Sequence, residues 1–201
     1  MKNIITLFTI VCSLNIAHAQ ETLQTAFEQT YAQERVGNYA GAVQTMNAVY
    51  NSNSYECNLR LAYLRYMSGS YVESTHLYQK AIALMPYAIE PRLGYVYPAA
   101  ALGKWDDVMN QYTAILKIEP KNSNVNYKIG VIYYNRKKYT QAYAHFEKVV
   151  NLYPFDYDGL LMFAWTNYRI GKLPQAKLLF KKVLLLSPDD KSALEGLSLI
   201  K

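Results

Sequence analysis

The stretch KKYTQAYAHFEKVVNLYP, residues 137–154, carries two signals that lead to different interpretations of the chain. It contains three lysines and one histidine among four aromatic residues, a composition that also occurs on surfaces that bind nucleic acid or membranes. Its apolar residues, however, return every three or four positions between Tyr139 and Val150, which indicates an amphipathic helix. Whether the stretch is a binding strip or a piece of scaffold depends on whether it recurs.

The stretch does recur along the chain. Copies of its opening phrase begin at Gly37, Gly69, Gly103, Lys137 and Gly171, and only the first step is slightly shorter than the others. Four prolines keep the same step, at Pro86, Pro120, Pro154 and Pro188. Because a fixed period of about 34 residues is the signature of a repeat architecture, the stretch is explained by the fold before it is explained by a ligand.

Each repeat is predicted to form two helices joined by a short turn. Glycine is suited to that turn because it reaches the left-handed conformation that ends a helix without steric cost. Proline follows the second helix because it cannot continue one. In the fourth copy, Lys137 stands where the other copies have glycine.

This pattern resembles the tetratricopeptide repeat family over residues 21–201. The aromatic residue that opens the second helix in that family is matched by Tyr39, Tyr71, Trp105 and Tyr139, and only Leu173 departs from it. The large residue seven positions later is matched by Met46, Tyr78, Tyr112, Phe146 and Phe180. The resemblance implies an all-α, right-handed α-solenoid of about five helix-turn-helix repeats followed by a C-terminal capping helix.

The period also gives the expected boundaries of the repeats. We place them at about 21–54, 55–88, 89–122, 123–156 and 157–190, with the capping helix at 191–201. A cap is required because the last repeat would otherwise expose the apolar face that each earlier repeat buries against its successor. Residues 20–201 are therefore predicted to form one solenoid domain.

Residues 1–19 have the pattern of a secretory signal peptide cleaved after Ala19. Lys2 precedes an apolar run that ends at Ala17, and this run is shorter than the roughly 20 apolar residues that a retained membrane anchor needs. We therefore expect an exported protein that is periplasmic, with the cell exterior as the alternative. Cys57 is then the only cysteine of the mature chain, and it is expected to be a small buried residue.

The formal net charge of +6 is unevenly distributed. Residues 20–120 carry 7 Lys+Arg and 9 Asp+Glu, a net charge of −2, whereas residues 121–201 carry 13 and 6, a net charge of +7. We interpret the basic half as a solvated surface, and we expect His145 and Lys148 to face water. The alternative is a surface that steers an acidic partner or an anionic polymer. Export disfavours nucleic acid as the partner.

No catalytic or metal-binding motif is found. His76 and His145 stand in separate second helices, and neither has a second histidine or a cysteine at the spacing of metal ligands. The sequence contains no nucleophile elbow, phosphate-binding glycine loop or HExxH motif. We therefore expect a non-enzymatic protein without cofactor or metal.

The resemblance implies that the first helices of the repeats line a concave groove. Aromatic residues occupy the implied groove positions in every repeat, at Phe27, Tyr31, Tyr63, Tyr66, Tyr97, Tyr127, Tyr134, Trp165 and Tyr168. Arg60, Lys128 and Arg169 lie among them and are expected to pair with carboxylates of a bound chain. The alternative is that the rings only seal the superhelix. As a set they favour recognition, because tyrosine combines an apolar body with a polar tip.

These observations predict an interaction scaffold of the cell envelope that holds a segment of a partner polypeptide in an aromatic groove. A glycan-binding envelope protein is the main alternative, because sugar rings also stack on tyrosine and tryptophan. A repeat protein that associates with itself through its ends is a third hypothesis. Pro98 lies inside the first helix of the third repeat, and it is expected to kink the helix beside Tyr97.

Overall fold

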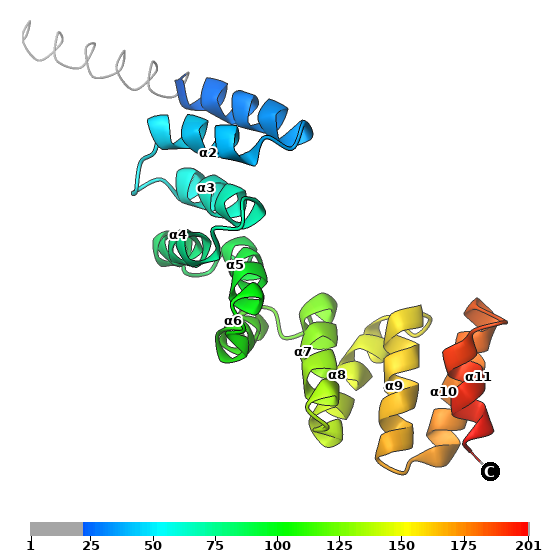
Figure 1. Ribbon diagram of the computed structural model, residues 1–201. Helices are drawn as coiled ribbons and strands as arrows, with labels where there is room; N and C mark the ends of the chain where they lie inside the picture. Colours follow the sequence, from blue (N-terminus) through cyan, green and yellow to red (C-terminus); the bar gives the residue numbers. More distant parts are fainter. Residues whose placement is uncertain (1–21, 201) are drawn as a thin grey trace, which may run out of the picture. The chain divides into compact units, whose positions relative to one another are not determined.

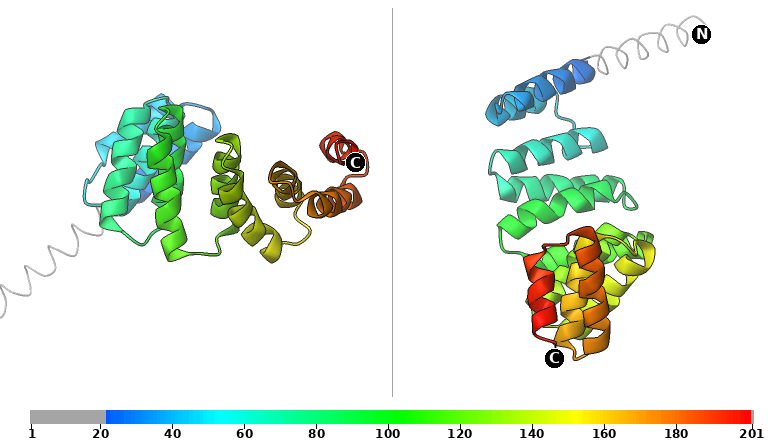
Figure 2. Two further views of the ribbon diagram at one scale, coloured as in Figure 1. Left: turned by 90° about the horizontal axis from the view of Figure 1, so that it is seen from below. Right: turned by 90° about the vertical axis from the view of Figure 1, so that its right-hand side faces the viewer.

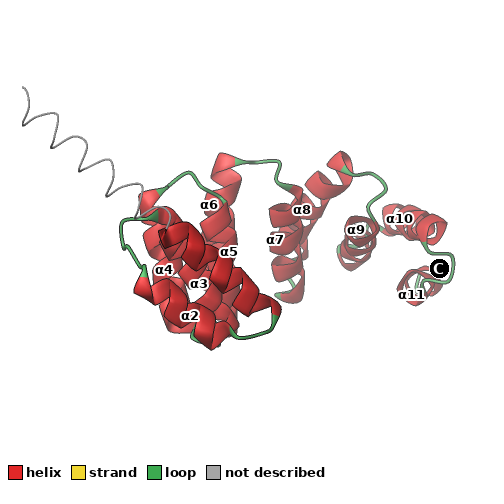
Figure 3. Ribbon diagram, turned by 90° about the horizontal axis from the view of Figure 1, so that it is seen from above, coloured by secondary structure: helices red, strands yellow, loops and turns green. Residues whose placement is uncertain are grey.

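The computed structural model describes residues 22–200, and within them the chain consists of helices joined by short loops, without a β-strand (Figure 3). Consecutive helices form antiparallel pairs, which confirms the predicted all-α architecture of helix-turn-helix repeats (Figure 1). The predicted signal peptide, residues 1–19, lies outside the described residues. Among residues 22–200, no helix has both the length and the apolarity that crossing a membrane requires.

The first described helix comprises residues 22–35. The helices that follow are α2 (Tyr39–Ala48), α3 (Tyr55–Met67), α4 (Tyr71–Leu84), α5 (Glu90–Ala101), α6 (Trp105–Ile118), α7 (Ser123–Asn135), α8 (Tyr139–Leu152), α9 (Tyr157–Arg169), α10 (Leu173–Leu186) and α11 (Lys191–Ser198). The predicted repeats therefore each contain one helix pair, and α11 occupies the position of the predicted cap.

The contacts within the chain divide it into two compact units. Unit 1 extends to Gln111 and unit 2 begins at Tyr112, so the boundary falls inside α6. In unit 1 the helices from residue 22 to α5 lie in successive layers (Figure 2). In unit 2, α7 packs on α8, α8 on α9, α9 on α10 and α10 on α11.

The turns between paired helices have the backbone geometry that the glycines predicted. Gly37, Gly69, Gly103 and Gly171 have φ angles between 71° and 82°, in the left-handed region. Lys137 occupies the same place in the fourth repeat with φ of 58°, the only positive φ of a non-glycine residue among residues 22–200. A lysine in this conformation carries a steric cost that glycine avoids.

Side chains cap the first helices of several repeats. The side chains of Ser54, Asn122 and Asp156 accept hydrogen bonds from backbone N–H groups in the first turns of α3, α7 and α9. Asp190 does the same at α11, accepting from the Ala193 N–H at 2.7 Å. These caps satisfy donors that a helix start leaves without a partner, and they fix where these four helices begin.

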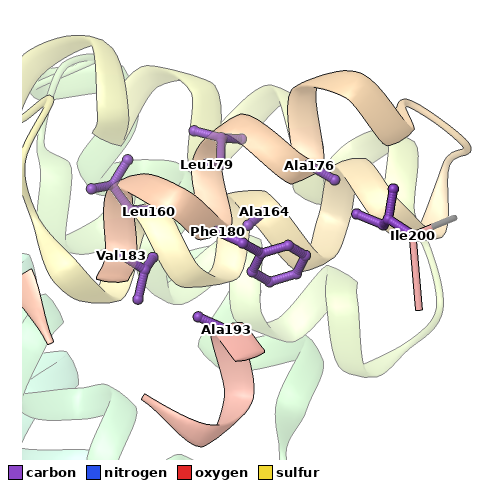
Figure 4. Packing of buried hydrophobic residues seen from close by; sticks show 8 residues of the cluster. All are labelled: Leu160, Ala164, Ala176, Leu179, Phe180, Val183, Ala193 and Ile200. Carbon is purple, nitrogen blue, oxygen red and sulfur yellow. The ribbon is translucent and has the colours of Figure 1, made fainter. Parts of the chain in front are cut away.

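In two of the repeats, the large residue of the second helix packs against a glycine of the following repeat or cap. In unit 2, Phe180 is fully buried in a cluster formed by α9, α10 and α11 (Figure 4). A Cβ atom added to Gly196 of α11 would lie 2.3 Å from the Phe180 ring, so only glycine lets that helix approach. The same relationship occurs in unit 1, where a Cβ on Gly94 of α5 would lie 2.3 Å from the Tyr78 ring.

Pro98 lies within its helix, at the position where the sequence predicted a kink. Helix α5 continues through the buried Pro98 to Ala101, and the Leu102 N–H donates to the Pro98 carbonyl at 3.0 Å. Because proline has no N–H, the carbonyl of Gly94 lacks the donor that an ordinary residue at position 98 would supply.

Candidate functional site

Unit 1 contains a cleft of about 560 Å³ between the first helices of its three repeats. Its walls carry both aromatic rings and carboxylates, contributed by Phe27, Tyr31, Glu34, Tyr55, Glu56, Leu59, Arg60, Tyr63, Tyr78, Glu90 and Gly94. Four of these residues, Phe27, Tyr31, Arg60 and Tyr63, are groove residues predicted from the sequence. We call this feature the unit 1 cleft.

Arg60 is the centre of a polar network at one side of the unit 1 cleft. It is only 7% exposed, and its Nη1 atom lies 2.7 Å from Glu34 Oε2. Its Nε atom donates to the hydroxyl of Thr30 at 3.1 Å, and its guanidinium carbon lies 3.9 Å from the centre of the Tyr31 ring. This cation is therefore used within the chain, whereas the sequence suggested that it pairs with a carboxylate of a partner.

Glu34 is held by two residues of α3. The Tyr63 hydroxyl donates to Glu34 Oε1 at 2.7 Å, while Arg60 pairs with the other carboxylate oxygen. Burial alone would raise the pKa of Glu34, but the hydrogen bonds from Tyr63 and Arg60 and the charge of Arg60 outweigh it and lower the pKa below its ordinary value of 4.5. Glu34 is thus ionised at neutral pH and joins the helix 22–35 to α3.

The opposite side of the unit 1 cleft is acidic. The Tyr55 hydroxyl donates to Glu90 Oε2 at 3.2 Å, and the Ser54 hydroxyl donates to Glu56 Oε2 at 2.8 Å. The pKa of Tyr55 is raised to about 12. Burial is the largest cause, followed by the charge of Glu90, the hydrogen bond to Glu90 and the charge of Glu56. The lining contains three carboxylates and one cation, a net charge of −2 for Glu34, Glu56, Glu90 and Arg60.

Two of the predicted rings in unit 1 are open to solvent. Tyr31 is 47% exposed and Tyr97 is 59% exposed. Tyr66 is half-buried, and its ring centre lies 5.9 Å from that of Tyr97. Phe27 is half-buried as well, with its ring edge-on to Tyr31 at 6.4 Å between ring centres. Aromatic pairs at this distance stabilise one another beyond the apolar area that they bury.

The predicted rings of unit 2 are more strongly engaged in packing. Trp165 donates its indole N–H to the Ser192 hydroxyl at 2.8 Å, and its ring centre lies 5.0 Å from that of Phe180. Tyr168 stands edge-on to Trp165 at 5.7 Å. Trp165 therefore helps to hold α11 on α9, which is the sealing role that the sequence left open for these rings.

The remaining predicted residues of unit 2 lie on α7 and α9. Tyr127 stands edge-on to Phe146 at 5.8 Å between ring centres, and Tyr134 to Tyr139 at 5.2 Å. Lys128 and Arg169 are exposed. Hydrogen bonding to the Tyr134 hydroxyl raises the pKa of Arg169 above its ordinary value. These two cations are accessible, unlike Arg60.

Unit 2 has a smaller acidic hollow of about 270 Å³ near Tyr127. Asp156 and Asp158 contribute carboxylates, and Tyr153 contributes a ring. The Asp156 carboxylate is already used as a helix cap, since it accepts from the Gly159 N–H at 2.7 Å. The unit 1 cleft is therefore the better developed of the two.

Four residues of the unit 1 cleft were not among the partner-binding residues predicted from the sequence, namely Glu34, Tyr55, Glu56 and Glu90. A signal for two of them was present, because the separation of Glu56 and Glu90 equals the repeat period, and hence they occupy the same place in successive repeats. Within residues 22–200 no group of three or more His, Cys, Asp or Glu residues is arranged to hold a metal ion. Cys57 is a buried free thiol, as the sequence predicted.

Comparison with known proteins identifies the repeat. Residues 125–156 match the sequence profile of the family described as tetratricopeptide repeat. Among curated proteins, none matches this sequence at a significant level.

Solved structures share the fold at low sequence identity. A tetratricopeptide repeat protein from Parabacteroides merdae ATCC 43184 superimposes with a TM-score of 0.75 at 18% identity, over 90% of this chain and 72% of that one. MamA from Desulfovibrio magneticus RS-1 gives 0.70 at 16% identity, over 85% and 97%. Another MamA structure gives 0.70 at 17% identity, over 82% and 91%. The chain therefore has the tetratricopeptide repeat fold, and residues 125–156 carry the sequence pattern of that family.

Proposed function

We propose that this protein is a non-enzymatic interaction scaffold of the cell envelope, which holds a segment of a partner polypeptide against the rings of its first helices. The observation that carries the proposal is the unit 1 cleft, in which Tyr31 is open to solvent beside buried, hydrogen-bonded polar groups. A concave site with aromatic walls and a few fixed polar groups suits ligand recognition. The tetratricopeptide fold supports a protein as the ligand.

The network around Arg60 supports a preformed site. Arg60, Glu34 and Tyr63 are linked by contacts of 2.7 Å, so the walls of the unit 1 cleft are fixed before any partner arrives. A preorganised surface loses less conformational entropy on binding than a mobile one. Exposed tyrosine rings add contact area at low entropic cost, which is why such rings are frequent at binding hot spots.

The envelope location rests on residues 1–19. Their basic start, apolar run and small residues before Gln20 have the order of a secretory signal peptide. Export predicts that the protein recovered from cells begins at Gln20, which intact-mass measurement would show. Recovery of a chain that still begins at Met1 would contradict export.

The binding role is tested by comparing two double variants of the chain. Tyr31→Ala/Tyr97→Ala removes exposed rings from the predicted groove, while Tyr87→Ala/Phe155→Ala removes exposed rings from the loops after α4 and α8. We expect a partner polypeptide retained by the unmodified chain to be lost from the first variant and kept by the second. Equal retention by both variants would make the groove assignment wrong.

A glycan ligand is the second candidate, and one observation favours it. Sugar-binding sites need polar groups that converge between the rings, and the unit 1 cleft brings together the carboxylates of Glu34, Glu56 and Glu90. Glu34 is already held by Arg60 and Tyr63, which leaves two carboxylates for such a ligand. Retention of the chain on isolated cell-wall material, unaffected by competing peptides, would favour the glycan.

A further inference from the structure

Resting on the proposed function, we infer that the unit 1 cleft selects polypeptide segments that carry a lysine or arginine side chain, with the cation placed at Glu56 and Glu90. The sequence suggested the opposite polarity, with cations of this chain meeting carboxylates of the partner. The structure reverses this for unit 1, because the Arg60 cation is buried and paired whereas two carboxylates remain exposed.

The charges of Glu56 and Glu90 are not compensated by the groups that they contact. Glu56 accepts a hydrogen bond from the Ser54 hydroxyl at 2.8 Å, and Glu90 accepts one from the Tyr55 hydroxyl at 3.2 Å. Both donors are neutral hydroxyl groups, so neither hydrogen bond brings an opposite charge to its carboxylate. Tyr55 is hydrogen-bonded to Glu90 and also lies in the field of Glu56, so the two carboxylates act on one place in the cleft.

The aromatic rings of the unit 1 cleft, like its carboxylates, can attract a cation. A cation is attracted to the face of an aromatic ring, and the attraction grows where water is excluded. The chain already uses this attraction, since the Arg60 guanidinium lies 3.9 Å from the centre of the Tyr31 ring and 5.6 Å from that of Tyr63. Tyr55 offers a further ring beside the free carboxylates.

Two features of the unit 1 cleft match the hydrogen-bonding groups of a peptide backbone. They favour a polypeptide ligand over an amine that has no peptide backbone. Arg60 lines the cleft and is 7% exposed, yet its Nη2 atom has no hydrogen-bond partner. Gly94 also lines the cleft, and Pro98 cannot supply the N–H that the Gly94 carbonyl would accept in a regular helix. A peptide backbone supplies an acceptor for the first group and a donor for the second, whereas an amine alone supplies only donors.

The test uses blocked hexalysine as the probe and the purified chain as the receptor. Glu56→Gln/Glu90→Gln removes the two charges and keeps the side-chain shapes. Glu73→Gln/Glu195→Gln, at exposed carboxylates of α4 and α11, removes the same number of negative charges and serves as the matched control. The dissociation constant is measured by fluorescence anisotropy at low and at physiological salt, because screening weakens a charge-driven contact.

We expect the dissociation constant for hexalysine to rise about tenfold in Glu56→Gln/Glu90→Gln and less than twofold in the control. Blocked hexaglutamate and hexaglycine should bind at least tenfold more weakly than hexalysine does to the unmodified chain. Equal affinity of the unmodified chain and Glu56→Gln/Glu90→Gln for hexalysine overturns the inference. An equal loss in the control overturns it too, because the effect would then belong to net charge.

Two further outcomes separate this inference from the proposed function. If hexalysine does not bind, while a partner polypeptide is still lost only from Tyr31→Ala/Tyr97→Ala, the preference for a cation is wrong and the scaffold role stands. If a glucosamine oligomer binds more tightly than hexalysine and is lost from Glu56→Gln/Glu90→Gln, the acidic cleft is a glycan site and the polypeptide assignment is overturned.

Discussion

The hydroxyl of Tyr63 in α3 donates a hydrogen bond of 2.7 Å to the carboxylate of Glu34 in the helix 22–35. The other oxygen of that carboxylate lies 2.7 Å from Arg60, which is buried between the same two helices. The Glu34 carboxylate therefore accepts a hydrogen bond from one residue of the next repeat and forms an ion pair with another. The same network forms a wall of the unit 1 cleft, so its loss should affect both stability and binding.

Glu34→Gln should lower the free energy of unfolding by about 1 to 3 kcal/mol. The substitution leaves the Arg60 charge buried without its partner, and breaking a buried ion pair from one side is costly. Glu28→Gln is the matched control, because Glu28 lies on the same helix and its exposed carboxylate accepts a hydrogen bond from Gln24. This variant should change the free energy of unfolding by less than about 0.5 kcal/mol. Urea unfolding measures the free energy of unfolding of both variants. Equal losses in the two would show that the ion pair between Glu34 and Arg60 contributes nothing to stability.

The Glu34 carboxylate should also make the stability of the protein depend on pH. Hydrogen bonds and the Arg60 charge hold the pKa of Glu34 below its ordinary value of 4.5, so the unfolded chain takes up the proton first. The stabilisation is present in full above that ordinary value and is lost as the pH falls through the lower pKa of the folded protein. Between pH 6 and pH 3 the unmodified chain should therefore lose more stability than Glu34→Gln. Parallel curves for the two chains would contradict this.

Lys137→Gly should stabilise the protein by about 0.5 to 1 kcal/mol. Lys137 has φ of 58° at a turn where the other repeats have glycine, and glycine adopts this conformation without the steric cost. Lys138→Gly, one residue later at φ of −88°, removes the same charge and should not stabilise. Thermal unfolding distinguishes the two variants, and a lower midpoint for Lys137→Gly would mean that the lysine side chain stabilises the turn by other contacts.

Gly196→Ala should destabilise unit 2 by about 1 to 3 kcal/mol, because the new methyl group would lie 2.3 Å from the buried Phe180 ring. Glu195→Ala, at the exposed neighbouring position, should have little effect. The loss should be visible as a lower denaturant midpoint. A midpoint unchanged by Gly196→Ala would show that α11 can move away from Phe180 at no cost.

The repeat architecture was predictable because its signals are local and periodic. The glycines that recur with the repeat period take the left-handed conformation, and Pro86, Pro120, Pro154 and Pro188 follow the ends of α4, α6, α8 and α10. These constraints act through the backbone of one or two residues, so no knowledge of distant contacts is needed.

Contacts between helices were not predictable in the same way. His145 was expected to face water, but its Nδ1 lies 3.0 Å from Asn126 Oδ1 and its ring stacks on Tyr133 at 5.7 Å between ring centres. Burial and then the charge of Lys148 lower the pKa of His145. Arg60 was expected to be available to a partner, but it pairs with Glu34 of the preceding repeat. A single-helix pattern cannot show which residue of another helix lies opposite.

The most direct test of the scaffold role asks which residue touches the partner. A photo-crosslinking amino acid is placed at Tyr97, whose ring is 59% exposed on α5, or at Tyr87, which is 85% exposed in the loop after α4. We predict that a polypeptide becomes attached in the envelope to the chain labelled at position 97 and not to the one labelled at 87, and that Tyr31→Ala reduces the yield. Attachment at position 87 alone would place the binding surface outside the groove and contradict the central claim.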